Sequence, residues 1–208
     1  MAQQGSTWGD PTMAGLFAVA AGNTAVWALL TERIAITDAS IFIAWLLAAG
    51  VILTIVGLIG LRNGDTINGV LNLCFGVFFF ATPALTYIFQ FWGGMPLLAL
   101  GIPGIPTTIV NGYVFIILGI VLATFVPILG RTSWVPSVAM LILVIGIFLM
   151  AFYLMQGFPP MGIWPLIGKI AGWFLLIGGL VMLYLGMAIG LLTGFGRVIL
   201  PVGRPIFK

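Results

Sequence analysis

The sequence is poor in charge, which excludes two broad classes of protein. Charged residues make up 5% of its 208 residues, whereas ordinary soluble domains contain about 25%. A soluble domain of this length needs more charged side chains to cover its surface. Intrinsic disorder is also excluded, because it requires low hydrophobicity and high charge, and 62% of these residues are hydrophobic. The composition is that of a polytopic membrane protein whose outer surface faces lipid.

The sequence has no histidine and a single cysteine, Cys74. These residues do not suffice for a His/Cys metal site, a Ser-His-Asp triad or a Cys-His pair. One cysteine also excludes an internal disulfide. We therefore expect no catalytic residues, no metal site and no cofactor, so the protein is predicted not to be an enzyme. We expect no nucleic-acid partner either.

Six continuously apolar stretches dominate the chain, and each is long enough to be a membrane span. About 20 apolar residues cross roughly 30 Å of hydrocarbon as a helix. Helices are favoured over a β-barrel because the stretches do not alternate with period two. We predict an all-α fold, one transmembrane domain over residues 1–208, with short tails at about 1–12 and 195–208. The predicted spans are Met13–Thr31, Ser40–Leu61, Ile67–Gln90, Gly112–Leu129, Val135–Met155 and Ile170–Thr193.

The basic residues predict the orientation of these spans. An even number of spans places both termini on one side of the membrane. That side would hold five basic residues, and the other side only Arg33 and Lys169. Because cytoplasmic loops carry the excess of Lys and Arg, both termini are predicted in the cytoplasm of a cell-membrane protein. The five basic residues are Arg62, Arg131, Arg197, Arg204 and Lys208.

The longest connection, Phe91–Asn111, carries no charge and is rich in Gly and Pro. Two alternatives remain open for it. In the first, it is an interfacial cap with Phe91 and Trp92 at the level of the lipid headgroups. Alternatively it is a re-entrant turn that lines an aqueous vestibule, where irregular backbone is tolerated.

Few polar side chains are expected inside the membrane, and none near the middle of a span is acidic, Arg or His. A conduit would have to use amides, hydroxyls, backbone groups and helix ends. Asn23 lies midway along the first span, and Asn72 lies four residues after Asn68 on one helical face. These amides either hydrogen-bond a small polar solute or clamp one helix to another.

Two further patterns have both structural and functional interpretations. Asp10 is suited to cap the first helix with Pro11 at its first position, or the segment folds into the mouth of a conduit and places Asp10 beside the solute. Gly178, Gly186 and Gly190 repeat along the sixth span. Such a face lets another helix approach closely, within a subunit or between subunits.

Several motifs of the chain resemble the acetate uptake transporter family, which includes bacterial succinate–acetate permeases and fungal acetate and ammonia-export relatives. The run from Phe195 to Gly203, FGRVILPVG, looks like the F-G-R-x-x-L-P-[IV]-G ending of that family. Gly172-Trp173 and Leu183–Met187 are similar to the pattern of its last helix. Gly64-Asp65-Thr66 stands where the family has G-N-T. At the start of the first helix, Pro11, Gly15 and Leu16 fit the N-P-[AV]-P-[LF]-G-L signature, while Asp10 and Met13 depart from it.

The resemblance implies a fold and a function. Family members are six-helix protomers, each with its own central path, and they assemble as hexamers. They move acetate and similar small monocarboxylates, by proton-linked uptake (symport) or by channel-like permeation. The alternative that we keep open is a channel for a small neutral solute such as ammonia, urea or a short amide.

The resemblance also implies path residues. The family's constriction uses a Phe after the first signature, a Tyr in the third helix and a Leu in the fifth. Alignment puts Val19 at the Phe, with Phe17 nearby, Phe75 at the Tyr, and Leu143 at the Leu. Met182 stands at a small residue near the path in the sixth helix. The predicted path residues are therefore Asp10, Pro11, Phe17, Val19, Asn23, Asn72, Phe75, Leu143 and Met182.

Overall fold

The computed structural model describes residues 9–34, 38–89, 109–157 and 162–207, and all of its regular elements are helical. Six helical spans of the described chain are long and apolar enough to cross a membrane, which confirms the predicted number. The elements are α1 (Thr12–Leu30), α2 (Ala39–Arg62), α3 (Thr66–Leu73), η2 (Cys74–Ala81), α4 (Thr82–Ile88), α6 (Ile109–Gly130), α7 (Trp134–Met155) and α8 (Trp164–Phe195).

The third span is one continuous helix with a widened middle. Its segments α3, η2 and α4 follow one another without a break, and η2 is π-helical. Pro83 follows this segment at the start of α4. Proline has no N–H for the preceding turn, and its ring crowds the carbonyl four residues earlier, so a wide turn before Pro83 relieves the clash. The π-helical segment places three phenylalanines in the core: Phe75, Phe79 and Phe80.

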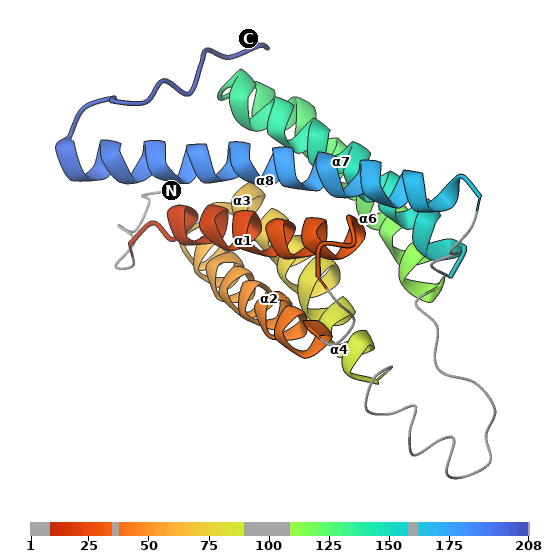
Figure 1. Cartoon of the computed structure of the whole chain (residues 1–208). Helices are drawn as coiled ribbons and strands as arrows, with labels where there is room; N and C mark the ends of the chain where they lie inside the picture. Colours follow the sequence, from red (N-terminus) through yellow and green to blue (C-terminus); the bar gives the residue numbers. More distant parts are fainter. Residues whose placement is uncertain (1–8, 35–37, 90–108, 158–161, 208) are drawn as a thin grey trace.

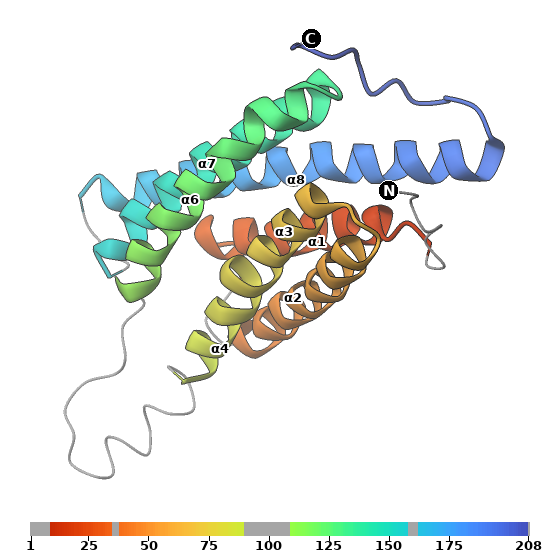
Figure 2. The same ribbon diagram turned by 180° about the vertical axis from the view of Figure 1, so that it is seen from behind.

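The six spans pack in a ring (Figures 1 and 2). The helix α1 lies against both α2 and α8, α8 lies against α7, and α7 lies against α6. The third span packs on α2, and η2 touches α6, which completes the ring. We call the end of the bundle where α1 begins and α8 ends the termini end, and the opposite end the far end.

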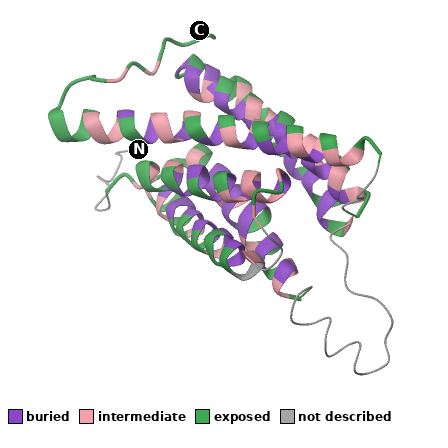
Figure 3. Ribbon diagram, in the orientation of Figure 1, coloured by how far each residue is buried: buried purple, intermediate pink, exposed green. Residues whose placement is uncertain are grey.

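Each helix buries one face and exposes another (Figure 3). The outward side chains are mostly large and apolar, as expected for a surface that faces lipid. Glycines let the helices approach closely within the subunit. A Cβ added to Gly178 would lie 2.5 Å from the Leu143 side chain of α7, and one added to Gly186 would lie 2.7 Å from Phe17 of α1.

Several boundaries differ from the prediction. The last helix begins at Trp164 rather than Ile170, with Pro165 in its first turn, where a proline costs no hydrogen bond. The Lys169 ammonium, on the resulting extra turn, lies 2.9 Å from the Glu32 carboxylate after α1. The fourth span begins at Ile109 rather than Gly112. Both alternatives for the connection Phe91–Asn111 concern a segment that, up to residue 108, lies outside the described residues.

Candidate solute path

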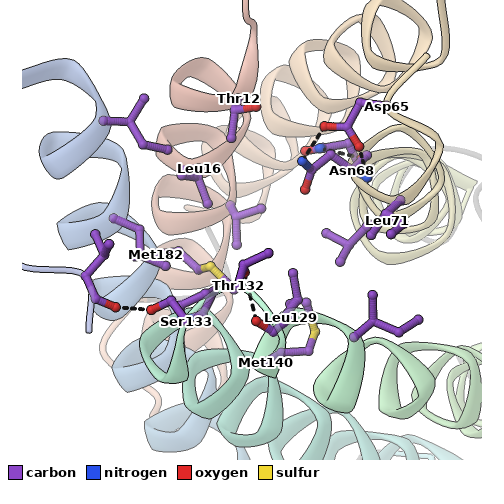
Figure 4. Close-up of a pocket in the computed structure, with 18 of the residues that line it drawn as sticks. Thr12, Leu16, Asp65, Asn68, Leu71, Leu129, Thr132, Ser133, Met140 and Met182 are labelled. Atoms are coloured by element: carbon purple, nitrogen blue, oxygen red, sulfur yellow. Dashed lines mark hydrogen bonds between the residues drawn. The ribbon is translucent and has the colours of Figure 1, made fainter. Parts of the chain in front are cut away.

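A cavity of about 500 Å³ enters the ring from the termini end (Figure 4). Five of the six spans line it, all but α2, together with the turn between α6 and α7 and the C-terminal tail. Its lining residues are Thr12, Leu16 and Val19 of α1; Asp65, Ile67, Asn68, Leu71, Asn72 and Phe75 of the third span and its start; Ile128 and Leu129 of α6; Thr132 and Ser133 of the turn after it; Pro136 and Met140 of α7; Met182, Leu185 and Ile189 of α8; and Val202 of the tail.

A second cavity, of about 460 Å³, adjoins the first at the same end. The two share the lining residues Thr12, Asp65, Asn68, Asn72 and Ile189. The second adds Asp10 and Pro11 before α1, Val56 and Gly60 of α2, and Asn63. The cavities therefore form one vestibule, and the predicted mouth residues Asp10 and Pro11 lie on its wall.

Two aspartates supply the ionisable groups on the vestibule wall: Asp65 is the N-cap of the third span, and Asp10 precedes Pro11, the N-cap of α1. The Asp10 carboxylate accepts hydrogen bonds from the backbone N–H of Thr12 (2.9 Å) and from its hydroxyl (2.6 Å). Asp65 accepts from the backbone N–H of Asn68 (3.1 Å) and from its side-chain amide (2.6 Å). The helix begins at Thr12, so Pro11 directly precedes it instead of being its first residue. The starts of α1 and the third span are thus partly satisfied by the chain's own carboxylates.

The Asn72 amide is partly committed to its own helix. Its Nδ2 donates to the carbonyl oxygen of Asn68 over 2.7 Å, and its Oδ1 lies close to Gly15 of α1. The threonine hydroxyls of the spans also bond to carbonyls of their own helices, as at Thr24, Thr54, Thr86 and Thr124. Few polar groups of the spans remain to meet a solute.

The C-terminal tail closes one side of the mouth. Gly196, in the left-handed conformation with φ 67°, ends α8 and turns the chain back. The Tyr184 hydroxyl then donates to the Pro201 carbonyl over 2.7 Å, and the Ser133 hydroxyl donates to the Val202 carbonyl. Further along, the N–H of Ile206 donates to the Gly130 carbonyl over 2.7 Å. Val202 is thereby held on the cavity wall.

The inner end of the vestibule is closed by apolar side chains. Val19, Phe75 and Met182 line this end and are buried. Leu143 is also fully buried and lies against Gly178 of α8. Beyond Phe75, the ring of Phe79 contacts Phe75 at 5.7 Å and Phe115 at 5.4 Å between centroids. A solute that goes deeper meets a tight hydrophobic constriction.

Asn23 follows this constriction on α1. Thr12, Leu16 and Val19 form a stripe along the vestibule face of the helix, and Asn23 is the next residue at helical spacing. Its side chain is fully buried, with a relative exposure of 0%. Within the described residues, neither its Nδ2 nor its Oδ1 has a hydrogen-bond partner. The clamp interpretation, in which Asn23 bonds to a neighbouring helix, is therefore not supported by the described contacts.

The structure brings most of the predicted path residues together. Six line the vestibule, and Asn23 and Leu143 lie deeper. Phe17 does not reach it: its ring packs against Gly186 of α8 and is 37% exposed. The six lining residues are Asp10, Pro11, Val19, Asn72, Phe75 and Met182.

Sequence reasoning missed other lining residues. Asn68, which the sequence placed on one helical face with Asn72, was named as a polar candidate but not among the predicted path residues, and it lines the vestibule. Val202 lies within the C-terminal motif, but nothing in the sequence indicated that the tail folds back. Leu16 and Met140 are apolar residues without a distinguishing pattern, so only the packing reveals their place on the wall.

Comparison with known proteins gives a similarity to a solved structure. No protein-family model matches the chain, and no curated protein matches it. Among solved structures, the chain is similar to the bacterial acetate channel SatP, with a TM-score of 0.78. The alignment covers 95% of this chain and 100% of that one, at 22% sequence identity. At this level of identity the similarity shows a shared fold, in agreement with the predicted six-helix architecture.

Proposed function

We propose that this protein is a membrane channel or transporter for acetate and similar small monocarboxylates. Its fold is shared with a protein that is an acetate channel. The observation that carries the proposal is the vestibule of about 500 Å³ that ends at the buried side chains of Val19, Phe75 and Met182. A cavity of this size admits a small solute, and an apolar constriction selects against charge.

Three features favour the neutral acid over the acetate anion. The transfer of an unpaired carboxylate into an apolar site carries a large desolvation cost. The ionisable groups on the vestibule wall are the carboxylates Asp10 and Asp65, which repel an anion. Both carboxylates already accept hydrogen bonds at the helix starts, so they occupy the positive ends that attract an anion. A solute that permeates as the protonated acid avoids the desolvation cost and the repulsion by the carboxylates, and it needs no positive helix end.

The orientation and assembly form part of the proposal. Among the described residues, the termini end carries Arg62, Arg131, Arg197 and Arg204, which supports a cytoplasmic vestibule and cytoplasmic termini. The C-terminal motif Phe195–Gly203 resembles that of a hexameric family, which supports a homohexamer in the lipid bilayer. The outward apolar side chains suit contact with either lipid or neighbouring subunits.

Uptake of labelled acetate into proteoliposomes tests this function. Protein-free vesicles are the essential control, because neutral acetic acid also crosses lipid. Above the pKa of a simple carboxylic acid, about 4.3, the fraction of the acid that is neutral falls roughly tenfold per pH unit. We therefore expect the protein-dependent rate at fixed total acetate to rise steeply from pH 8 to pH 5. A rate that stays flat over this range contradicts permeation as the neutral acid, and no rate above the control contradicts the function.

Asp65→Asn separates the charge of the vestibule from its shape. Asparagine caps a helix about as well as aspartate, so the third span should keep its start. We expect uptake by the variant at pH 8 to stay level, because the neutral acid carries no charge for Asp65 to repel; a higher rate would show that the anion permeates. Asp38→Asn, which changes a carboxylate before α2 at the far end, is the matched control and should leave the rate unchanged.

A second candidate function is a channel for a small neutral solute such as ammonia, urea or a short amide. The unpartnered amide of Asn23 favours it, since an amide both donates and accepts hydrogen bonds. A competition assay with labelled acetate distinguishes the two functions. Formamide or ammonia that enters faster than acetic acid and blocks its uptake would favour the second candidate.

A further inference from the structure

The starting observation is the energetic cost of Asn23. Its side chain is fully buried, and its Nδ2 and Oδ1 both lack a partner among the residues that the structure describes. Each unsatisfied buried polar group costs about 1–3 kcal/mol. An isosteric apolar residue such as leucine would avoid this cost, so the amide makes the fold less stable than it need be. Orphaned polar groups of this kind call for an explanation, and a transient ligand is one.

The position of Asn23 points to a solute that has passed the constriction. On α1, Val19 lines the vestibule and Asn23 follows it by one turn. On α8, Met182 lines the vestibule and Gly179 follows it by nearly one turn toward the far end. A Cβ added to Gly179 would lie 3.0 Å from the Asn23 Cβ. Asn23 and Gly179, which follow the lining residues on α1 and α8, therefore lie against each other beyond Val19 and Met182.

We propose that Asn23 is a binding station for the neutral carboxylic acid, which it holds by two hydrogen bonds. The amide offers an N–H donor and a carbonyl acceptor side by side. A protonated carboxyl group offers the complement, an acceptor carbonyl and an O–H donor on one carbon. This inference rests on the proposed function and adds a residue that reads the protonation state of the solute.

The carboxylate ion does not fit the same station. It has acceptors only, so it satisfies Nδ2 and leaves the Oδ1 of Asn23 facing another oxygen. It also brings a charge to a buried site for which the described contacts provide no cation. The same amide that accepts acetic acid therefore rejects acetate, without any ionisable group of its own.

The charged side chains on the helices around Asn23 lie toward the ends of the spans. On α1 and its flanks these are Asp10, Glu32 and Arg33, and α8 carries Lys169 near its start and Tyr184 in its second half. Lys169 pairs with Glu32, and Tyr184 donates to Pro201. Asp38 precedes α2 and Arg62 ends it. The third span, whose Phe80 ring lies against Gly22, carries Asp65, the thiol of Cys74 and Tyr87. Protonation of the solute, rather than of a residue beside Asn23, then sets the pH dependence at this station.

One more polar group continues the same face of α1. The indole Nε1 of Trp27, four residues after Asn23, is buried and has no partner within the described chain. The Trp27 ring lies edge-on to Trp173, with centroids 5.4 Å apart. The indole N–H gives the solute a single donor one turn nearer the far end.

Two substitutions and one control test the station in proteoliposomes and by thermal unfolding. Asn23→Leu removes both hydrogen-bonding groups, and Asn23→Ala does so with a smaller side chain that cannot clash. Thr24→Val is the control, because the Thr24 hydroxyl bonds to the Ala20 carbonyl of its own helix. We expect protein-dependent acetate uptake at pH 5 to fall about tenfold in both Asn23 variants, and the unfolding temperature of Asn23→Leu to stay level or rise. Thr24→Val should keep both values.

A spectroscopic readout detects binding apart from flux. Infrared difference spectra with carbon-13-labelled acetate distinguish the carbonyl band of the acid from the bands of the carboxylate. We expect the acid band of bound solute in the original protein and in Thr24→Val, and its loss in Asn23→Leu.

The outcomes separate this inference from the proposed function. If the original protein carries acetate and both Asn23 variants match its rate, the station is wrong and the function stands. If Asn23→Leu lowers the unfolding temperature together with the rate, Asn23 is a helix clamp and the inference is overturned. If the original protein gives no rate above protein-free vesicles, the proposed function itself fails.

Discussion

Gly50 of α2 and Gly76 of η2 bring two helix backbones into direct contact. A Cβ added to Gly76 would lie 3.0 Å from the Gly50 carbonyl oxygen and 2.8 Å from the Thr54 nitrogen. A Cβ added to Gly50 would lie 3.0 Å from the Gly76 carbonyl oxygen. Small residues permit this approach in membrane helices. The contact sets the third span against α2, and with it the position of Phe75 next to Gly76.

Gly76→Ala should destabilise the protein by about 1–3 kcal/mol, the usual cost of overpacking a tight site. The new methyl group meets backbone atoms, which cannot move away as a side chain can. Thermal unfolding in detergent measures the effect. The control is Gly194→Ala near the end of α8, where no described atom lies within 4 Å of the added Cβ and alanine favours the helix. Equal unfolding temperatures for the two variants would show that the helices do not pack this closely.

Phe75→Ala should widen the constriction and relax the size selectivity for monocarboxylates. Phe75 is fully buried at the inner end of the vestibule, and loss of such a ring costs about 3–5 kcal/mol of stability. We expect uptake of butyrate to rise relative to acetate. Phe78→Ala is the matched control, because Phe78 lies in the same π-helical segment but is 49% exposed.

The unfolding temperature of each phenylalanine variant is measured before its flux, so that misfolding is not mistaken for selectivity. A folded Phe75→Ala protein with an unchanged ratio of butyrate to acetate uptake would remove Phe75 from the path.

Tyr184→Phe should loosen the C-terminal tail at the mouth. It deletes the hydroxyl that donates to the Pro201 carbonyl, a bond worth about 0.5–1.5 kcal/mol. The readout is the rate at which a thiol reagent modifies Leu16→Cys, on the vestibule wall, in a Cys74→Ser background. We expect faster modification from the termini side. Thr193→Val, whose hydroxyl bonds to the Ile189 carbonyl within α8, should leave the rate unchanged, and equal rates for all three proteins would show that the tail does not restrict entry.

Much of the architecture could be predicted from local sequence. The apolar runs determine the number of spans, because a helix is the structure that satisfies its own backbone in lipid. Boundaries were less predictable where polar and apolar signals overlap. Trp164–Lys169 contains Pro165 and Lys169 and resembles a loop, yet it is helical: Pro165 lies in the first turn, where a proline costs no hydrogen bond, and Lys169 pairs with Glu32 after α1.

The candidate site was predictable only where a residue type carried a signal of its own. Asp10, Asn72 and Asn23 stand out as polar groups beside or within apolar spans. Phe17 and Val19 differ by two positions, and a helix turns about 200° over two residues, so they point in nearly opposite directions. Only the packing of α1 on Gly186 shows that Phe17 faces α8 and Val19 faces the vestibule.

The sequence by itself determined that this protein lies in lipid. With so few charges and six apolar runs, each helix must satisfy its own backbone hydrogen bonds and face lipid. It also determined that no acidic residue, arginine or histidine lies near the middle of a span. The tertiary structure alone decided which amides have a hydrogen-bond partner. Asn72 and Asn23 look alike in the sequence, but Asn72 donates a hydrogen bond to its own helix. Asn23 lies against Gly179 and has no hydrogen-bond partner among the described residues. Whether a buried amide finds a partner on another helix, or only on its own helix, depends on how the helices pack.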